Sequence, residues 1–236
     1  MSKNLRNKII VALDSSNVVH QISIVKKLGD GINFYKIGLS SIASGGLGLA
    51  NELKAQGKRV FIDLKLFDIG NTIEKAVYGL SQFDIDFLTV HGDPHVIKAA
   101  IKGRKNRKLK ILAVTLLTSL NRKDLDKSLI RNGTVENLVT KRAKIAFDSG
   151  ADGIICSPNE VKKVRSLENS TGKIIVTPGI RLDGNQSHDQ KRVGDPASTL
   201  NNGADYLVIG RPITEAKNPF EEVKTIISQI TDNLKA

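Results

Sequence analysis

Apolar and polar residues alternate along this chain in blocks of two kinds. Short, nearly continuous apolar runs rich in β-branched residues are typical of strands that are covered on both faces. The predicted strands are KIIVALD (8–14), NFYKIGL (33–39), RVFIDLK (59–65), DFLTVHG (86–92), KILAVTLL (110–117), DGIICS (152–157), KIIVTPG (173–179) and DYLVIGR (205–211). Between them, amphipathic segments predict helices, among them 16–29, 69–82, 135–149 and 217–234.

The order of these elements predicts the fold class. Eight alternations of strand and helix in 236 residues fit a single α/β domain, a (β/α)8 or TIM barrel, which typically has about 250 residues. We therefore assign residues 1–236 to one barrel domain with its site at the C-terminal ends of the strands. A doubly wound open sheet is the alternative, but no G-x-G-x-x-G follows the first predicted strand.

Composition and charge narrow the setting in which the protein works. Cys156 is the single cysteine, which excludes an internal disulfide and favours a reducing, cytoplasmic compartment. We expect no signal peptide, and no apolar run approaches the roughly 20 residues that span a bilayer. The net charge of +12 suits binding of nucleic acid or attraction of small anionic substrates. The densest basic cluster, 101–112, lacks aromatic residues for base stacking, so we expect no nucleic acid as a partner. The lack of a long apolar run leads us to expect no membrane as a partner.

Polar side chains gather at the predicted C-terminal ends of the strands, where barrels of this kind carry their functional residues. These are Asp14, Lys36, Asp63, Lys65, His91, Thr118, Arg181 and Arg211. The sequence therefore predicts one functional site, at the C-terminal end of the barrel.

The stretch FIDLKLFDIGNT, residues 61–72, places charges where a buried strand should avoid them. Side chains two apart on a strand share a face, so Asp63 and Lys65 are predicted to project together into the barrel mouth. Lys36 ends the preceding strand, and Asp68 follows Lys65 in the loop. An alternation of lysine and aspartate, Lys36–Asp63–Lys65–Asp68, would keep all four groups ionised. A salt-bridge network kept for stability is the alternative, although buried pairs stabilise poorly compared with apolar residues.

A second group of residues predicts a phosphate site. The loops after the seventh and eighth strands of such barrels commonly form a phosphate cradle. Gly210 and Arg211 lie there, and they offer backbone N–H groups and a guanidinium that can grip two oxygens. The stretch 181–195 is long and polar and contains glycine, which suits a lid that closes over a ligand.

The segment DLKLFDIGNT resembles the signature D-x-K-x-x-D-I-x-N-T of the orotidine 5'-phosphate decarboxylase family. The similarity continues in VALD, YKIG, TVHG, VTLLTS, TPGIR, DQKRV and VIGRPI, which stand in the family's order from Asp14 to Pro212. Two departures are visible. Gly70 stands where the family usually has proline, and VGDPAS (193–198) is atypical after the arginine. We expect Gly70 to loosen its loop, whereas neither departure removes a charged group.

The resemblance implies conversion of orotidine 5'-monophosphate to UMP and carbon dioxide, the last step of UMP biosynthesis, without metal or organic cofactor. Lys65 matches the acid that protonates C6, and its ammonium would also stabilise the developing carbanion. Asp63 would lie beside the substrate carboxylate, and their repulsion would ease as carbon dioxide leaves. Lys36 would hold Asp63 in place and contact the ribose.

The resemblance also assigns the remaining substrate contacts. Asp14 and Thr72 match ribose-hydroxyl or site-closing positions, and Thr118 matches a contact to the pyrimidine. Arg181 and Gln190 match the lid and substrate-binding positions, while Gly210 and Arg211 match the phosphate site. In the family, the aspartate at the position of Asp68 reaches the site of the partner subunit, so we expect a homodimer in which Asp68 and Thr72 are shared.

Two other functions remain open. Magnesium-dependent sugar-phosphate decarboxylases and synthases share the D-x-K-x-x-D barrel but need acidic ligands, typically a glutamate near the position of Lys36. A nucleic-acid-binding barrel would explain the charge of +12 but leaves the interior carboxylates unexplained.

Three weaker candidates remain. His91 is interpreted either as a buried, satisfied histidine or as a group that organises water. The four histidines lack ligand spacing, so we expect no metal site, and Cys156 is expected to pack in the core.

Overall fold

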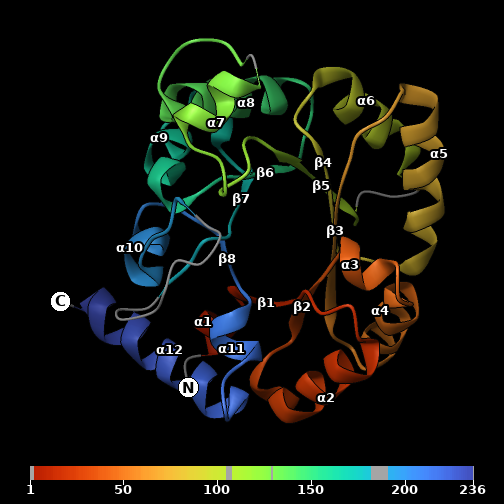
Figure 1. Cartoon of the computed structure of the whole chain (residues 1–236), viewed down its shortest axis with the longest axis vertical. Coiled ribbons are helices and arrows are strands. Elements are labelled where there is room, and N and C mark those ends of the chain that lie inside the picture. The colour runs from red at the N-terminus through yellow and green to blue at the C-terminus, as the bar shows by residue number, and fades with distance from the viewer. Residues whose placement is uncertain (1–2, 105–107, 129, 182–190, 236) are drawn as a thin grey trace.

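A computed structural model describes residues 3–104, 108–128, 130–181 and 191–235 of the chain. Eight parallel strands close into a barrel in sequence order, and helices surround it (Figure 1). The (β/α)8 prediction is therefore confirmed, and the open sheet is excluded. The strands are β1 (Ile9–Leu13), β2 (Phe34–Gly38), β3 (Arg59–Leu66), β4 (Phe87–His91), β5 (Lys110–Val114), β6 (Gly153–Ile155), β7 (Ile174–Thr177) and β8 (Tyr206–Ile209).

The helices follow the strands around the barrel. They are α1 (Lys3–Arg6), α2 (Val18–Leu28), α3 (Leu39–Ile42), α4 (Gly46–Ala55), α5 (Gly70–Leu80), α6 (Pro94–Gly103), α7 (Arg122–Lys127), α8 (Val135–Asp148), α9 (Val161–Arg165), α10 (Pro196–Asn201), α11 (Arg211–Thr214) and α12 (Pro219–Lys235). The four helices predicted by range correspond to α2, α5, α8 and α12, each within a few residues of the predicted bounds.

Local sequence signals set where these helices begin and end. Asn17 caps α2 by accepting the backbone N–H of His20, and Thr134 caps α8 in the same way. Gly150 lies between α8 and β6 with φ +94°, a left-handed conformation that glycine adopts without the penalty of a Cβ atom. The two caps fix where α2 and α8 begin, and Gly150 leads the chain from α8 into β6.

Alternate residues of each strand point to opposite sides of the barrel wall. Inside the wall lies a cluster built from Ile10, Ala12, Phe34, Phe61, Phe87, Leu112, Val114, Ile155, Val176 and Val208. The other face of the wall packs against the helices in a larger apolar core. Lys36 and Asp63 have the same parity as Phe34 and Phe61, so the inward rows of β2 and β3 change from apolar to charged toward the C-terminal end.

The N-terminal end of the barrel is closed by an aromatic floor formed by Phe34, Arg59, Phe87 and Tyr206. Each is the first residue of its strand. The guanidinium carbon of Arg59 lies 3.9 Å from the ring centroid of Phe34 and 5.2 Å from that of Tyr206. Such stacking of a cation on aromatic faces is favourable, and Phe34 and Phe87 also pack edge to face. These contacts fill the N-terminal end of the barrel with packed side chains.

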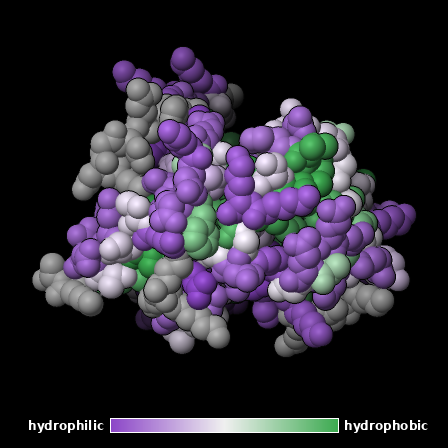
Figure 2. Space-filling model, turned by 90° about the horizontal axis from the view of Figure 1, so that it is seen from below, coloured by the Kyte–Doolittle hydropathy of each residue, from purple (hydrophilic) through white to green (hydrophobic). Residues whose placement is uncertain are grey.

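The surface agrees with the polar composition of the chain. The face shown in Figure 2 is largely hydrophilic, with a smaller group of hydrophobic side chains on one side. No helix in the described part of the chain is long and apolar enough to cross a membrane.

Candidate active site

A cavity of about 790 Å³ opens at the C-terminal ends of the strands. It is lined by eight of the residues that the sequence proposed for the site: Asp14, Lys36, Asp63, Lys65, Thr118, Arg181, Gly210 and Arg211. They come from β1, β2, β3 and the loops after β5, β7 and β8, which lie far apart in the sequence. The barrel therefore brings together residues as far apart in the chain as Asp14 and Arg211.

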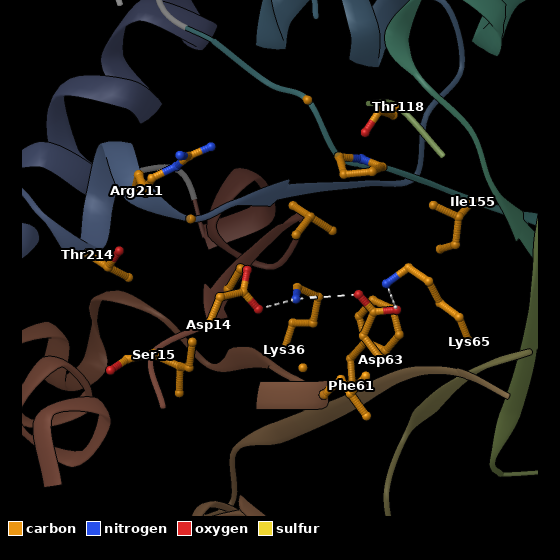
Figure 3. A pocket seen from close by; sticks show the side chains of 18 of the residues that line it. Asp14, Ser15, Lys36, Phe61, Asp63, Lys65, Thr118, Ile155, Arg211 and Thr214 are labelled. Carbon is orange, nitrogen blue, oxygen red and sulfur yellow. Dashed lines mark hydrogen bonds and ion pairs between the residues drawn. The ribbon is translucent and has the colours of Figure 1, made fainter. Parts of the chain in front are cut away.

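Four of these residues form an unbroken chain of opposite charges (Figure 3). The Lys36 ammonium lies 2.6 Å from Oδ1 of Asp14 and 3.4 Å from Oδ2 of Asp63. The Lys65 ammonium lies 2.9 Å from Oδ1 of Asp63. The charges alternate as Asp14–Lys36–Asp63–Lys65, so each inner member has an opposite charge on both sides.

The two inner members are the buried ones. The side chains of Lys36 and Asp63 are 9% and 12% exposed, whereas that of Asp14 is 59% exposed. Burial alone would lower the pKa of Lys36, but the charges of Asp63 and Asp14 outweigh it and raise this pKa. Burial alone would raise the pKa of Asp63, but Lys36 and Lys65 outweigh it and lower that pKa. Both groups are consequently ionised at neutral pH.

The prediction that Asp68 continues the alternation within the chain is wrong. Asp68 is exposed, does not line the cavity, and accepts the backbone N–H of Ile69. Asp14 takes the fourth place instead, because β1 is the neighbour of β2 in the barrel and the chain leaves β1 at Asp14. Thr72 is also exposed, on the first turn of α5, and lies outside the cavity lining. A role for Asp68 and Thr72 in a partner's site stays a prediction.

An irregularity in β3 shapes the end of the strand that carries Lys65. Ile62 pairs with Leu88 and Leu66 with Val90, so three residues of β3 lie opposite Thr89 alone. Lys65 has φ +50°, a conformation that costs a non-glycine residue about 1–2 kcal/mol. Bulges of this kind commonly re-aim side chains next to active sites.

Thr89 fills this irregularity, and sequence reasoning missed it. Its Oγ1 lies 3.0 Å from the backbone nitrogen of Lys65 and 2.8 Å from Oδ1 of Asp63. The available signal was parity, since Thr89 stands between the inward Phe87 and the strand end at His91 within DFLTVHG.

Arg211, one of the residues predicted to hold phosphate, lies across the cavity from Lys65 (Figure 3). Gly210 precedes the first turn of α11, and Arg211 begins that turn. A Cβ atom at Gly210 would lie 3.4 Å from the Cβ of Ala12, so glycine gives the backbone room beside β1. Arg181 lines the cavity and donates from Nη1 to the carbonyl of Ile180. Gln190, with most of the predicted lid 181–195, lies outside the described residues.

A buried ion pair ties together the loops around this cavity. The Arg192 guanidinium lies 2.5 Å from Oε1 of Glu160, and both side chains are less than a tenth exposed. Arg192 also donates to the carbonyl oxygens of Leu116 and Leu117, which precede Thr118. This pair could not be predicted from the sequence, because the spacing of two charges 32 residues apart does not reveal that they meet.

The segment VGDPAS, which departs from the family pattern, has a clear local role. Asp195 caps α10 by accepting the backbone N–H of Ser198, and Pro196 occupies the first helical position. A Cβ atom at Gly194 would lie 2.4 Å from Pro158, so this glycine permits a close approach of two loops.

His91 and Cys156, the weaker candidates, lie in different surroundings. His91 is partly exposed, and its Nδ1 lies 2.5 Å from Oδ2 of Asp93, so the buried interpretation is wrong. Cys156 is fully buried in the apolar core, as predicted, and burial raises the pKa of its thiol. Among the described residues, no cluster of three or more acidic, histidine or cysteine side chains is arranged to hold a metal ion.

Comparison with known proteins identifies relatives over nearly the whole chain. A sequence model of the family described as orotidine 5'-phosphate decarboxylase / HUMPS family matches residues 7–226. An orotidine 5'-phosphate decarboxylase of Ruegeria pomeroyi is 55% identical over 226 residues, covering 95% of this chain and 94% of that protein. One of Jannaschia sp. is 52% identical over 225 residues, covering 95% and 98%. The crystal structure of orotidine 5'-phosphate decarboxylase from Lactobacillus acidophilus is similar with a TM-score of 0.81 and 34% identity, covering 95% and 99%.

Proposed function

Because the chain belongs to the orotidine 5'-phosphate decarboxylase / HUMPS family, we propose that it converts orotidine 5'-monophosphate to UMP and carbon dioxide. The reaction would supply UMP in pyrimidine biosynthesis in the cytoplasm. The observation that carries this proposal is the alternation Asp14–Lys36–Asp63–Lys65 in the cavity at the C-terminal end of the barrel. It places an ammonium group beside a carboxylate that is held ionised.

Loss of the C6 carboxylate is the difficult step of this reaction. The bond between C6 and the carboxylate carbon breaks, and its electron pair stays on C6, where no electron sink is available. The Lys65 ammonium stabilises this pair and then gives it a proton, leaving UMP and a neutral lysine. Asp63 lies beside the departing carboxylate in this scheme, and the repulsion between the two anions ends when carbon dioxide leaves.

The remaining site residues bind and orient the substrate. Asp14 and Lys36 contact ribose hydroxyls or close the site, and Thr118 contacts the pyrimidine. Gly210 and Arg211 hold the phosphate, with Arg181 and Gln190 closing over it. Binding energy from the phosphate, which does not react, can organise the reacting end of the substrate.

We further propose that two chains form a dimer and that Asp68 and Thr72 act in the partner's site. Their exposure at the rim of the barrel, outside the chain's own cavity lining, supports this assignment. Symmetric dimers of this type present the same surface from both subunits, so each site would receive both residues.

Magnesium-dependent sugar-phosphate decarboxylases and synthases that share the D-x-K-x-x-D barrel are the alternative function. In this chain the Lys36 ammonium lies between the two carboxylates that would otherwise be candidates for binding a cation. A lysine in that place is a poor neighbour for Mg²⁺, which prefers oxygen ligands. We therefore propose that the reaction needs no metal.

One experiment tests both the activity and the absence of a metal requirement. Purified protein is mixed with orotidine 5'-monophosphate, and the loss of ultraviolet absorbance is followed before and after exhaustive treatment with EDTA. We expect equal rates in both samples and UMP as the product. Absence of turnover would refute the proposed activity, whereas activity lost to EDTA and restored by Mg²⁺ would favour the magnesium enzymes.

A further inference from the structure

Thr89 is a fully buried polar residue in the middle of β4, just below the charged chain. Its Oγ1 lies within hydrogen-bond distance of two groups of β3. The backbone nitrogen of Lys65 is 3.0 Å away, and Oδ1 of Asp63 is 2.8 Å away. One hydroxyl therefore contacts both the backbone of the proposed acid and the side chain of the carboxylate beside it.

The irregular pairing of β3 and β4 explains why a side chain is needed here. In a regular parallel ladder, the N–H of Lys65 would donate to a carbonyl of the neighbouring strand. Three residues of β3 face Thr89 alone, and Lys65 has a positive φ, so the ladder is interrupted at this point. The Thr89 hydroxyl accepts the N–H in place of a carbonyl, which satisfies a buried donor.

The direction of the hydroxyl proton follows from its two partners. A backbone N–H can only donate, and an ionised carboxylate can only accept. Thr89 therefore accepts from Lys65 and donates to Oδ1 of Asp63. The same Oδ1 faces the Lys65 ammonium at 2.9 Å, while Oδ2 faces Lys36 at 3.4 Å. The rotation of the Asp63 carboxylate is fixed from three sides.

We propose that Thr89 is a positioning residue for the decarboxylation. Its hydroxyl holds the strained backbone of Lys65 and the carboxylate of Asp63 in one arrangement, and this arrangement directs the Lys65 ammonium at C6. The inference rests on the proposed function. It adds a residue that does not itself line the cavity but sets the geometry of two residues that do.

The test compares variants at position 89. Thr89→Val keeps the shape and removes the hydroxyl, and we expect kcat to fall about 10- to 100-fold, as for a lost hydrogen bond to a charged group. KM and the Kd for UMP should stay within about threefold, because the substrate contacts remain. Thr89→Ser should retain most of the activity, whereas Thr89→Ala should resemble Thr89→Val. The serine and alanine pair isolates the hydroxyl even if valine prevents folding.

Thr177→Val is the matched control. Thr177 is fully buried at the end of β7, and its hydroxyl has no hydrogen-bond partner in the described part of the chain. This variant should keep the kcat of the wild type. Any of four results would overturn the inference. Thr89→Ser could lose as much kcat as Thr89→Ala, or Thr89→Ala could keep the kcat of the wild type. Thr177→Val could lose as much kcat as Thr89→Val, or UMP binding could weaken in parallel with kcat. The wild-type rate is measured first, and its absence would refute the proposed function and the inference with it.

Discussion

Replacing Lys36 by methionine removes the cation between two carboxylates and keeps a side chain of similar length. The attraction between Lys36 and Asp63, at 3.4 Å and an effective dielectric constant of about 20, is roughly 5 kcal/mol before desolvation is subtracted. The pair with Asp14 counts for at most about 1 kcal/mol, because Asp14 is 59% exposed and screened by water. The buried Asp63 therefore dominates the effect.

Removing one partner of a buried pair typically costs about 3–5 kcal/mol, because a charge is left without compensation. Asp63 still keeps Lys65 and Thr89 as partners in the variant, which favours the low end of this range. We expect Lys36→Met to lower the free energy of unfolding by about 3 kcal/mol at neutral pH. The matched control is Lys102→Met, which removes an exposed partner of Glu74 and should cost no more than about 0.5 kcal/mol.

The pH dependence provides a second test of the same reasoning. In the wild type the pKa of Asp63 is lowered by folding, so its stabilisation is present above the unfolded pKa and is lost as pH falls through the folded pKa. Without Lys36, burial should raise this pKa, so the variant should gain stability as pH falls. Urea unfolding at about pH 7.5 and about pH 5 should show the difference shrinking on acidification. A cost below about 1 kcal/mol, or one that grows on acidification, would refute the reasoning.

Three further predictions address the proposed roles. Lys65→Ala should reduce decarboxylation by at least about 10²- to 10⁴-fold and leave UMP binding, measured by calorimetry, largely intact; near wild-type turnover would end the proposed mechanism. Arg211→Ala should weaken UMP binding and lower kcat/KM together, because both depend on the phosphate contact; unchanged kinetics would place that contact elsewhere. Lys65→Ala and Asp68→Ala proteins should each be nearly inactive, whereas their mixture should recover about one quarter of wild-type activity, since half the dimers are mixed and each has one complete site. No recovery after confirmed subunit exchange would exclude a shared site.

The sequence predicted the barrel well because its signals are local. Apolar runs and glycine turns recur with each strand and helix, and each predicted strand overlaps an observed one. The strand bounds were less accurate. The fifth predicted strand ran to 117, but β5 ends at Val114, and Leu116 and Leu117 instead line the cavity. Apolar residues that face a ligand cavity cannot be told from strand residues by hydrophobicity alone.

The charged chain was predicted only in part. Lys36, Asp63 and Lys65 could be joined because strand order and parity place them together. The prediction included Asp68 in the charged chain and not Asp14, because Asp68 is close to Lys65 in the sequence. In the structure Asp68 is exposed and lies outside the cavity lining. The positive φ of Lys65 could not be predicted from the sequence, since lysine rarely adopts this conformation. The role of Thr89 could not be predicted either, because it depends on that backbone conformation.

The aromatic floor has a consequence for how this chain can evolve. Strand β3 begins at the floor with Arg59 and ends in the cavity with Asp63 and Lys65. A change at Arg59 acts on the packing of Phe34 and Tyr206, while a change at the other end acts on charges that meet the ligand. Substitutions at the floor can thus alter stability without reaching the ligand, whereas substitutions at Asp63 or Lys65 change stability and turnover together.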